Sequence, residues 1–113
     1  MYNDDSMRFK HILDMSYSVV TMVKGHTRQD IDTDEKLRMA VLYALIIIGE
    51  AASYISDSFK EKHSDIPWKK ITGMRNRVVH GYFDTDLDIV WEAVTRNIPN
   101  LIEQLEKNIE IQP

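Results

Sequence analysis

Arg75 and His80 are the residues whose types and spacing best support a chemical reaction. A guanidinium binds phosphate oxygens in pairs, and an imidazole can give or take a proton near neutral pH. Gly81 follows directly and indicates the end of a helix, because the residue after a helix often takes left-handed backbone angles that only glycine adopts without strain. His80 is then expected in the last helical turn, where the helix dipole favours the imidazolium and suits the ring for acid–base catalysis.

On an ideal helix, the side chains of Arg75 and His80 do not point in the same direction. At 3.6 residues per turn, Asn76 and His80 lie on the same face, whereas Arg75 lies well over a quarter-turn away from His80. Arg75 must therefore reach round the helix with its long side chain, or meet the His80 of a second copy. An arginine and a histidine at this spacing are common by chance, so the surrounding sequence has to support the site.

A local basic patch surrounds the pair, although the whole chain carries a net charge of −4. Residues 60–80 contain six Lys or Arg and two acidic residues, which gives +4 and leaves −8 for the remainder. Lys69, Lys70 and Arg77 are the candidate binding cations of this patch, which can hold the phosphate backbone of a nucleic acid. The competing interpretation is an ordinary solvated turn.

Length and composition predict one cytoplasmic domain, residues 1–113. The chain has no cysteine, which excludes disulfides and thiolate metal sites. No apolar run approaches the roughly 20 residues that a membrane span needs, and the acidic amino terminus does not resemble a secretory signal. There is no glycine-rich phosphate loop and no Gly-x-Ser-x-Gly motif, so the common nucleotide-binding and hydrolase classes are disfavoured.

Metal and cofactor sites are not predicted. Residues 30–34 and 84–88 resemble the first half of a calcium loop, but both lack the required glycine and glutamate and are better explained as acidic helix starts. His11, His26 and His63 have no partners that would complete a three-ligand set.

Hydrophobic periodicity predicts an all-α antiparallel bundle of four main helices with additional short ones. The first helix covers residues 4–24 and ends at Gly25, and an apolar central helix covers residues 37–59. A short helix is expected from Pro67, a separate one over residues 72–80, and a long last helix over residues 87–109 that Pro99 should kink.

Capping patterns mark three of the helix starts, namely Thr27 with Asp30, Asp32 with Glu35, and Thr85 with Asp88. Within the central helix, Gly49, Ala51 and Ala52 should let another backbone approach closely. Glu50 could pair with a cation such as Arg75 or form a polar edge of the core, and the second role is favoured.

The segment 75–82 resembles the Arg-x4-His-x-Tyr motif of the HepT-like toxins, members of the HEPN superfamily of helical ribonucleases. Residues 48–52, 66–68 and 97–99 are also similar to that family, so the resemblance covers nearly the whole chain. It implies a homodimeric, metal-independent endoribonuclease toxin in which the catalytic pairs of two subunits meet in one cleft. Arg75 and His80 are the matching catalytic positions, and Asn76 is the supporting polar residue.

This implied activity fits the chemistry of RNA, whose 2′-hydroxyl is an internal nucleophile. The protein has only to move protons and to stabilise charge on the phosphorane. The resemblance further implies a partner, a minimal nucleotidyltransferase antitoxin that attaches AMP to the motif tyrosine, here Tyr82. The plainer role for Tyr82 is aromatic packing with Phe83.

A second class of function stays open beside the ribonuclease. The chain could be a non-catalytic helical subunit that presents nucleotide or substrate to a nucleotidyltransferase, and a purely structural dimerisation module is the remaining alternative.

Overall fold

The computed structural model describes residues 4–80 and 86–109, except for the side chains of residues 79 and 80. Within these ranges the ordered elements are all helical, and no strand is present, which confirms the predicted all-α class. The elements are α1 Asp4–Val23, α2 Arg28–Thr33, α3 Glu35–Ser53, α4 Asp57–Lys62, α5 Trp68–His80, α6 Leu87–Glu92, the π-helical η1 Ala93–Asn97 and α7 Ile98–Ile109.

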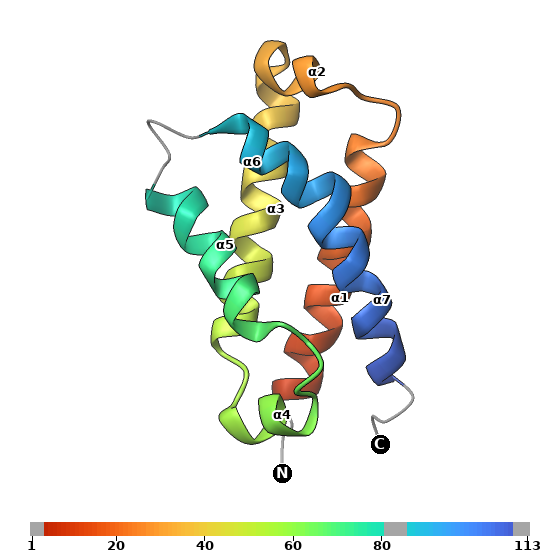
Figure 1. Ribbon diagram of the computed structural model, residues 1–113, viewed down its shortest axis with the longest axis vertical. Helices are drawn as coiled ribbons and strands as arrows, with labels where there is room; N and C mark the ends of the chain where they lie inside the picture. Colours follow the sequence, from red (N-terminus) through yellow and green to blue (C-terminus); the bar gives the residue numbers. More distant parts are fainter. Residues whose placement is uncertain (1–3, 81–85, 110–113) are drawn as a thin grey trace.

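The helices form an elongated body of 46 × 27 × 22 Å in which α3 has a central place. In Figure 1, α1 runs up from the amino terminus, α3 runs back down, α5 runs up, and the α6–η1–α7 segment descends to the carboxyl terminus. α3 packs against both α1 and α5, and α1 also packs against α7. The helix predicted to be apolar on nearly every face is therefore the one that packs most extensively against the other helices.

The core explains why these helices pack together. Leu45 and Ile48 of α3, together with Ile12 and Val19 of α1, are completely buried. Full burial of such a side chain contributes about 1.5–3 kcal/mol, so this helix pair supplies much of the hydrophobic stabilisation. Ile98 and Leu105 bring α7 onto the same core.

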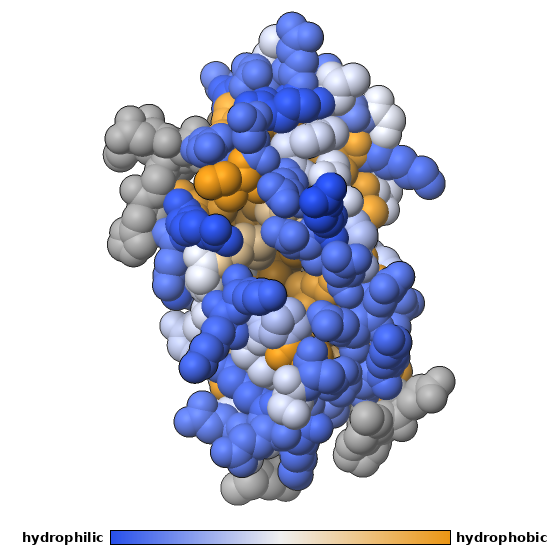
Figure 2. Space-filling view, viewed as in Figure 1, coloured by the Kyte–Doolittle hydropathy of each residue, from blue (hydrophilic) through white to orange (hydrophobic). Residues whose placement is uncertain are grey.

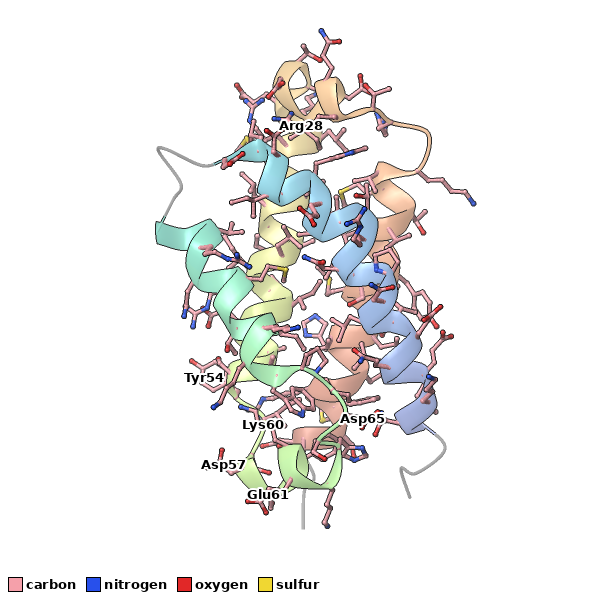
Figure 3. All side chains as sticks on the ribbon, viewed as in Figure 1. Arg28, Tyr54, Asp57, Lys60, Glu61 and Asp65 are labelled. Atoms are coloured by element: carbon pink, nitrogen blue, oxygen red, sulfur yellow. The ribbon has the colours of Figure 1, made fainter. Side chains whose placement is uncertain are left out.

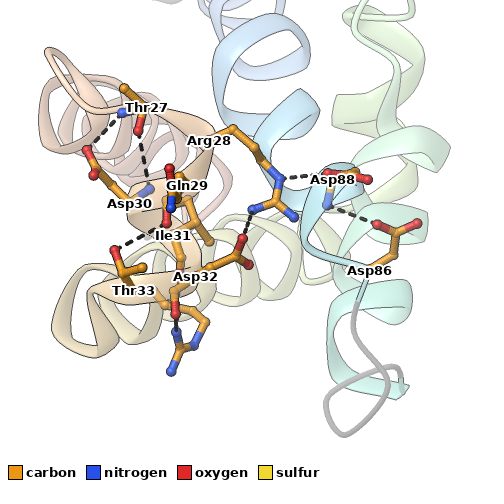
Figure 4. Close-up of polar contacts among 10 residues, drawn as sticks. Thr27, Arg28, Gln29, Asp30, Ile31, Asp32, Thr33, Asp86 and Asp88 are labelled. Carbon is orange, nitrogen blue, oxygen red and sulfur yellow. Dashed lines mark hydrogen bonds and ion pairs between the residues drawn. The ribbon is translucent and has the colours of Figure 1, made fainter.

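The connection between α1 and α2 agrees with the sequence prediction. α1 ends before Gly25, whose φ of +82° is the left-handed angle expected of a glycine stop. Thr27 then caps α2: its side chain accepts from the Asp30 backbone, and Asp30 accepts in return from the Thr27 N–H at 2.9 Å (Figure 4). This reciprocal capping box is confirmed.

The central helix was predicted too long. α3 ends at Ser53 rather than at residue 59, because Ser56 caps a new helix, α4, by accepting from the Phe59 N–H. Asp5 of α1 fixes this corner by accepting from the Ser56 backbone and hydroxyl at 2.9 and 2.6 Å. Periodicity alone could not show the break, since the apolar spacing continues across it.

Two predicted helix starts were displaced. α3 is capped by Asp34, which accepts from the Leu37 N–H at 3.0 Å, and not by Asp32. α6 is capped by Asp86, while the predicted cap Thr85 lies outside the described residues. Closely spaced acids offer several equivalent capping side chains, and the fold selects among them.

The structure also differs from two predictions made for the segments near Pro67 and Pro99. The helix expected from residue 72 and the short one before it are a single helix, α5, anchored where the Trp68 indole N–H donates to the His63 carbonyl at 3.1 Å. The irregularity expected at Pro99 is a π-helical turn, η1, directly before it. Pro99 has no N–H to offer the preceding turn, which is a recognised cause of such local widening.

A buried polar cluster joins α7 to the loop between α4 and α5. The His63 imidazole is 4% exposed and donates through Nδ1 to the Asn108 side-chain oxygen at 2.7 Å. Asn108 donates in turn to the Asp65 carboxylate and to the Gln104 carbonyl. The His63 imidazole therefore has a structural role.

None of the helices in the part of the chain that the structure describes has both the length and the apolarity to cross a membrane.

Candidate active site

Gly49 is where α5 makes its closest approach to α3. A Cβ placed on Gly49 would overlap the Arg75 Cβ and would lie 3.3 Å from the Arg75 Cα, so only glycine lets the two backbones meet here. The predicted close approach at Gly49 is confirmed, and α5 is the helix that uses it. The packing at Gly49 therefore sets the position of the Arg75 backbone, whatever contacts its guanidinium makes.

Glu50, the next residue on α3, holds the guanidinium of Arg75. Its Oε1 lies 3.2 Å from Arg75 Nη1 in an ion pair whose side chains are 39% and 25% exposed. The favoured interpretation of Glu50 as a polar core edge was wrong, and the alternative pairing with Arg75 is the one formed. Sequence spacing could not decide this, because the two residues are 25 positions apart.

The guanidinium keeps most of its hydrogen-bonding capacity. Arginine has five N–H donors, and the contact with Glu50 engages one nitrogen. The Nε atom of Arg75 is buried and has no hydrogen-bond partner among the described residues. Because Nε is buried, an anionic group such as a phosphate would be held by the terminal nitrogens of this oriented guanidinium.

The other motif residues follow Arg75 along α5. Asn76 and Arg77 are exposed, and Val78 is buried in the core. Position 80 is the last described residue of α5, and both the predicted helix stop at Gly81 and the His80 side chain lie outside the described residues. The predicted modification site, Tyr82, also lies outside them.

The predicted RNA-binding cations do not form one cluster. Lys70 and Arg77 line one cavity between α5 and the η1–α7 segment. Lys69 lines a neighbouring pocket that Lys70 borders as well and to which Asp57, Lys60 and Glu61 of α4 contribute. Figure 3 labels these three α4 residues at the base of the molecule, where positive and negative groups alternate.

No group of three potential metal ligands is found in the described ranges. His63 is bound to Asn108, and His26 lies 3.0 Å from Asp30 in an exposed pair. The acids at 30 and 86 serve as helix-start residues, as the sequence interpretation of these segments expected.

An exposed apolar stripe runs along α3 beside this site. Met39 and Tyr43 of α3 and Tyr54, the residue directly after α3, are 56%, 63% and 65% exposed, and the half-buried Ile46 and Ile47 lie between them. These positions recur at three- and four-residue steps, so they share one face of the helix. Glu50 lies on the same face, which places the stripe next to Arg75.

Comparison with known proteins assigns the chain to a family. The sequence profile described as "Ribonuclease HepT-like" matches residues 12–108, which span α1 to α7. The chain belongs to the HepT-like ribonuclease family. The resemblance first seen in the segment 75–82 is thereby confirmed, and with it the assignment to a family of enzymes.

Curated relatives of this HepT-like chain agree over most of its length. "Putative RNase TTE0752" of Caldanaerobacter subterraneus subsp. tengcongensis is 38% identical over 89% of this chain and 90% of its own. "Putative RNase MJ1380" of Methanocaldococcus jannaschii is 35% identical, covering 84% and 87%. "Probable ribonuclease HepT" of Thermococcus cleftensis is 35% identical, covering 87% and 93%. No solved structure matches the chain.

Proposed function

We propose that this HepT-like chain is a metal-independent endoribonuclease whose catalytic residues are Arg75 and His80. The observation that carries the proposal is the placement of Arg75: Gly49 admits its backbone, Glu50 orients its guanidinium, and the same helix also bears position 80. Asn76 is exposed one residue on and is assigned a supporting polar role. Membership in a ribonuclease family supports RNA as the substrate.

The reaction uses the nucleophile that RNA already contains. His80 takes the proton of the 2′-hydroxyl, and the 2′-oxygen forms a bond to the adjacent phosphorus. The bond from phosphorus to the 5′-oxygen breaks, and a second imidazolium supplies the proton of the new 5′-hydroxyl. Arg75 holds the non-bridging oxygens while their charge increases. The products are a cyclic 2′,3′-phosphate and a 5′-hydroxyl end.

A homodimer supplies the second imidazolium. We assign its interface to the α3 stripe, since Met39 and Tyr43 expose apolar surface that has no partner among the described residues. Glu50 lies on that face, so a second copy packed there brings two Arg75–Glu50 pairs toward one cleft. Each protomer is taken as a single HEPN-like domain with an antiparallel four-helix bundle.

The proposal extends to regulation by a toxin–antitoxin partner in the cytoplasm. A minimal nucleotidyltransferase would attach AMP to Tyr82, two positions after His80 in the sequence. The added phosphate and adenosine would bring negative charge and bulk to a site built for an RNA phosphate, and would block it by repulsion.

The deciding experiment compares wild type with Arg75→Ala and His80→Ala on cellular RNA, in the presence of a chelator. Wild type should cut RNA to cyclic-phosphate ends, and His80→Ala should slow cutting by at least about a hundredfold, the usual contribution of a general acid–base group. Circular dichroism and sedimentation should show that both variants keep the fold and the dimer. Intact RNA after incubation with well-folded wild type would overturn the proposal and favour the non-catalytic subunit.

A further inference from the structure

A large cavity lies between α5 and the η1–α7 segment. It has a volume of about 730 Å³, within the range of about 300–1,000 Å³ typical of small-molecule sites. Figure 2 shows apolar surface in a hollow near the centre of the molecule, bordered by hydrophilic surface on both sides. We call this cavity the α5–α7 groove.

The floor of the α5–α7 groove is apolar. Ile71 and Met74 of α5 and Ile98 and Leu101 of α7 line it, and each is less than a tenth exposed. These side chains belong to the hydrophobic core, so the floor is a fixed surface. A flat apolar group, such as the face of a nucleobase, can be desolvated against it.

The rim of the groove carries unpaired polar groups. Lys70 and Arg77 are exposed cations, and neither forms an ion pair with a carboxylate in the described ranges. Asn97 and Asn100 face them across the groove, and their amides have no hydrogen-bond partner among the described residues. No described carboxylate lines the cavity.

This combination matches one unpaired nucleotide. Side-chain amides can donate to and accept from the edge of a base, and lysine and arginine bind phosphate. The absence of a lining acid favours a negatively charged occupant. Bases inside a duplex hide both their faces and their pairing edges, so only a splayed-out base can reach such a floor.

We propose that the α5–α7 groove binds one unpaired nucleotide of the RNA substrate, with its base against the apolar floor, its edge toward the two asparagines and its phosphate toward the two cations. The inference rests on the proposed ribonuclease function and deepens it, because it makes single-stranded RNA the substrate class. The occupied nucleotide lies near the cleaved one in the chain. At 1.5 Å of rise per residue, Lys70 is about 15 Å from position 80 along α5, a span of a few nucleotides.

Binding of short labelled RNA to the His80→Ala protein tests this inference, since this background should leave the RNA intact. The probes are a single-stranded oligoadenylate, the same strand with abasic sugars, and its duplex with oligouridylate. The single strand should bind about tenfold more tightly than the other two. Asn97→Ala/Asn100→Ala and Gly73→Leu should each remove that advantage; Gly73 lines the groove, and a Cβ added there meets no atom within 4 Å.

Matched controls separate the groove from the general charge of the protein. Gln29→Ala removes an exposed amide of α2, and Lys36→Ala removes an exposed cation of α3, and both should leave all three affinities unchanged. Lys70→Ala/Arg77→Ala should instead weaken every probe and flatten the salt dependence.

Two results would overturn the groove assignment: equal affinity for intact and abasic strands, or groove variants that bind the single strand as wild type does. A groove variant that loses only the nucleotidyltransferase partner would assign the surface to protein instead. Because the readout is binding, base-dependent affinity in a protein that never cuts RNA would preserve this inference while removing the proposed activity.

Discussion

At the scale of single residues, one glycine and one arginine determine the candidate site together. Because Gly49 has no side chain, the backbone of α5 at Arg75 can pack directly against α3. Glu50 then fixes the direction of the guanidinium. The two α3 residues act on different parts of Arg75, the first on its backbone and the second on its charge.

Gly49→Ala should destabilise the protein, while Gly73→Ala should stabilise it. The new methyl group at position 49 overlaps Arg75, and such overpacking costs about 1–3 kcal/mol. At Gly73 the methyl meets no atom within 4 Å, so the better helix propensity of alanine should add about 0.5–1 kcal/mol. Thermal melts of the two variants should therefore shift in opposite directions, and equal shifts would show that Gly49 is not a packing constraint.

Glu50→Ala should reduce RNA cleavage far more than it reduces stability. A partly exposed ion pair contributes only about 0.2–1 kcal/mol to folding, but loss of an oriented guanidinium should slow cleavage about tenfold. Glu92→Ala is the matched control, since Glu92 pairs with Arg96 at 3.7 Å on the exposed surface. A Glu50 variant that cuts RNA as fast as the Glu92 variant would remove the positioning role.

At the scale of elements, short capped helices fix the ends of the long ones. α2 is only six residues long, yet its Arg28 forms ion pairs with Asp32 at 3.1 Å and with Asp88 of α6 at 2.7 Å (Figure 4). This link holds the first turn of α6 against α2. Two elements far apart in the sequence are therefore joined at one end of the molecule.

Acid should weaken the start of α2. The Thr27 backbone N–H, and then the His26 imidazole, hold the pKa of Asp30 below its usual value of 3.8. A carboxyl group whose pKa is lowered by folding contributes stability above its unfolded pKa and loses it as the pH falls through the folded value. Asp30→Ala should therefore lower the melting temperature at pH 7, and the difference from wild type should shrink below about pH 4. A constant difference down to pH 2 would contradict this.

At the scale of the whole molecule, two faces of α5 border different surface features. The side toward α3 carries Arg75 and continues into the exposed apolar stripe, where we place the second copy. A different face of α5 borders the α5–α7 groove with Lys70 and Arg77, where we place the unpaired nucleotide. An RNA strand bound in the groove would thus approach the catalytic cleft along the helix that bears both predicted catalytic residues.

Met39→Glu should weaken the dimer and RNA cleavage together. A charge introduced into an apolar interface costs several kcal/mol, and each 1.4 kcal/mol changes the dissociation constant tenfold. Met7→Glu is the control, because Met7 is 54% exposed against 56% for Met39 but lies on α1, away from the stripe. Sedimentation equilibrium should show a monomer only for Met39→Glu. A dimer that persists in that variant would place the interface elsewhere.

The sequence by itself determined the helical class, the glycine stop of α1 and the capping box of α2, because each depends on residues within a few positions of one another. It also determined the family, through similar residues in the segments 48–52, 66–68, 75–82 and 97–99. It misplaced the end of α3, since Ser56 is a cap only in combination with Asp5, 51 residues earlier.

Only the tertiary structure decided which residue pairs with Arg75 and which lysines and arginines line the α5–α7 groove. The contact of Arg75 with Gly49 and Glu50 depends on how α5 lies across α3, and periodicity does not specify that crossing. Lys69 and Lys70 are neighbours in sequence, yet Lys70 reaches the groove that Arg77 lines and Lys69 does not. A helix turns 100° at each residue, so adjacent side chains face different surfaces, and the packing of the other helices decides what those surfaces meet.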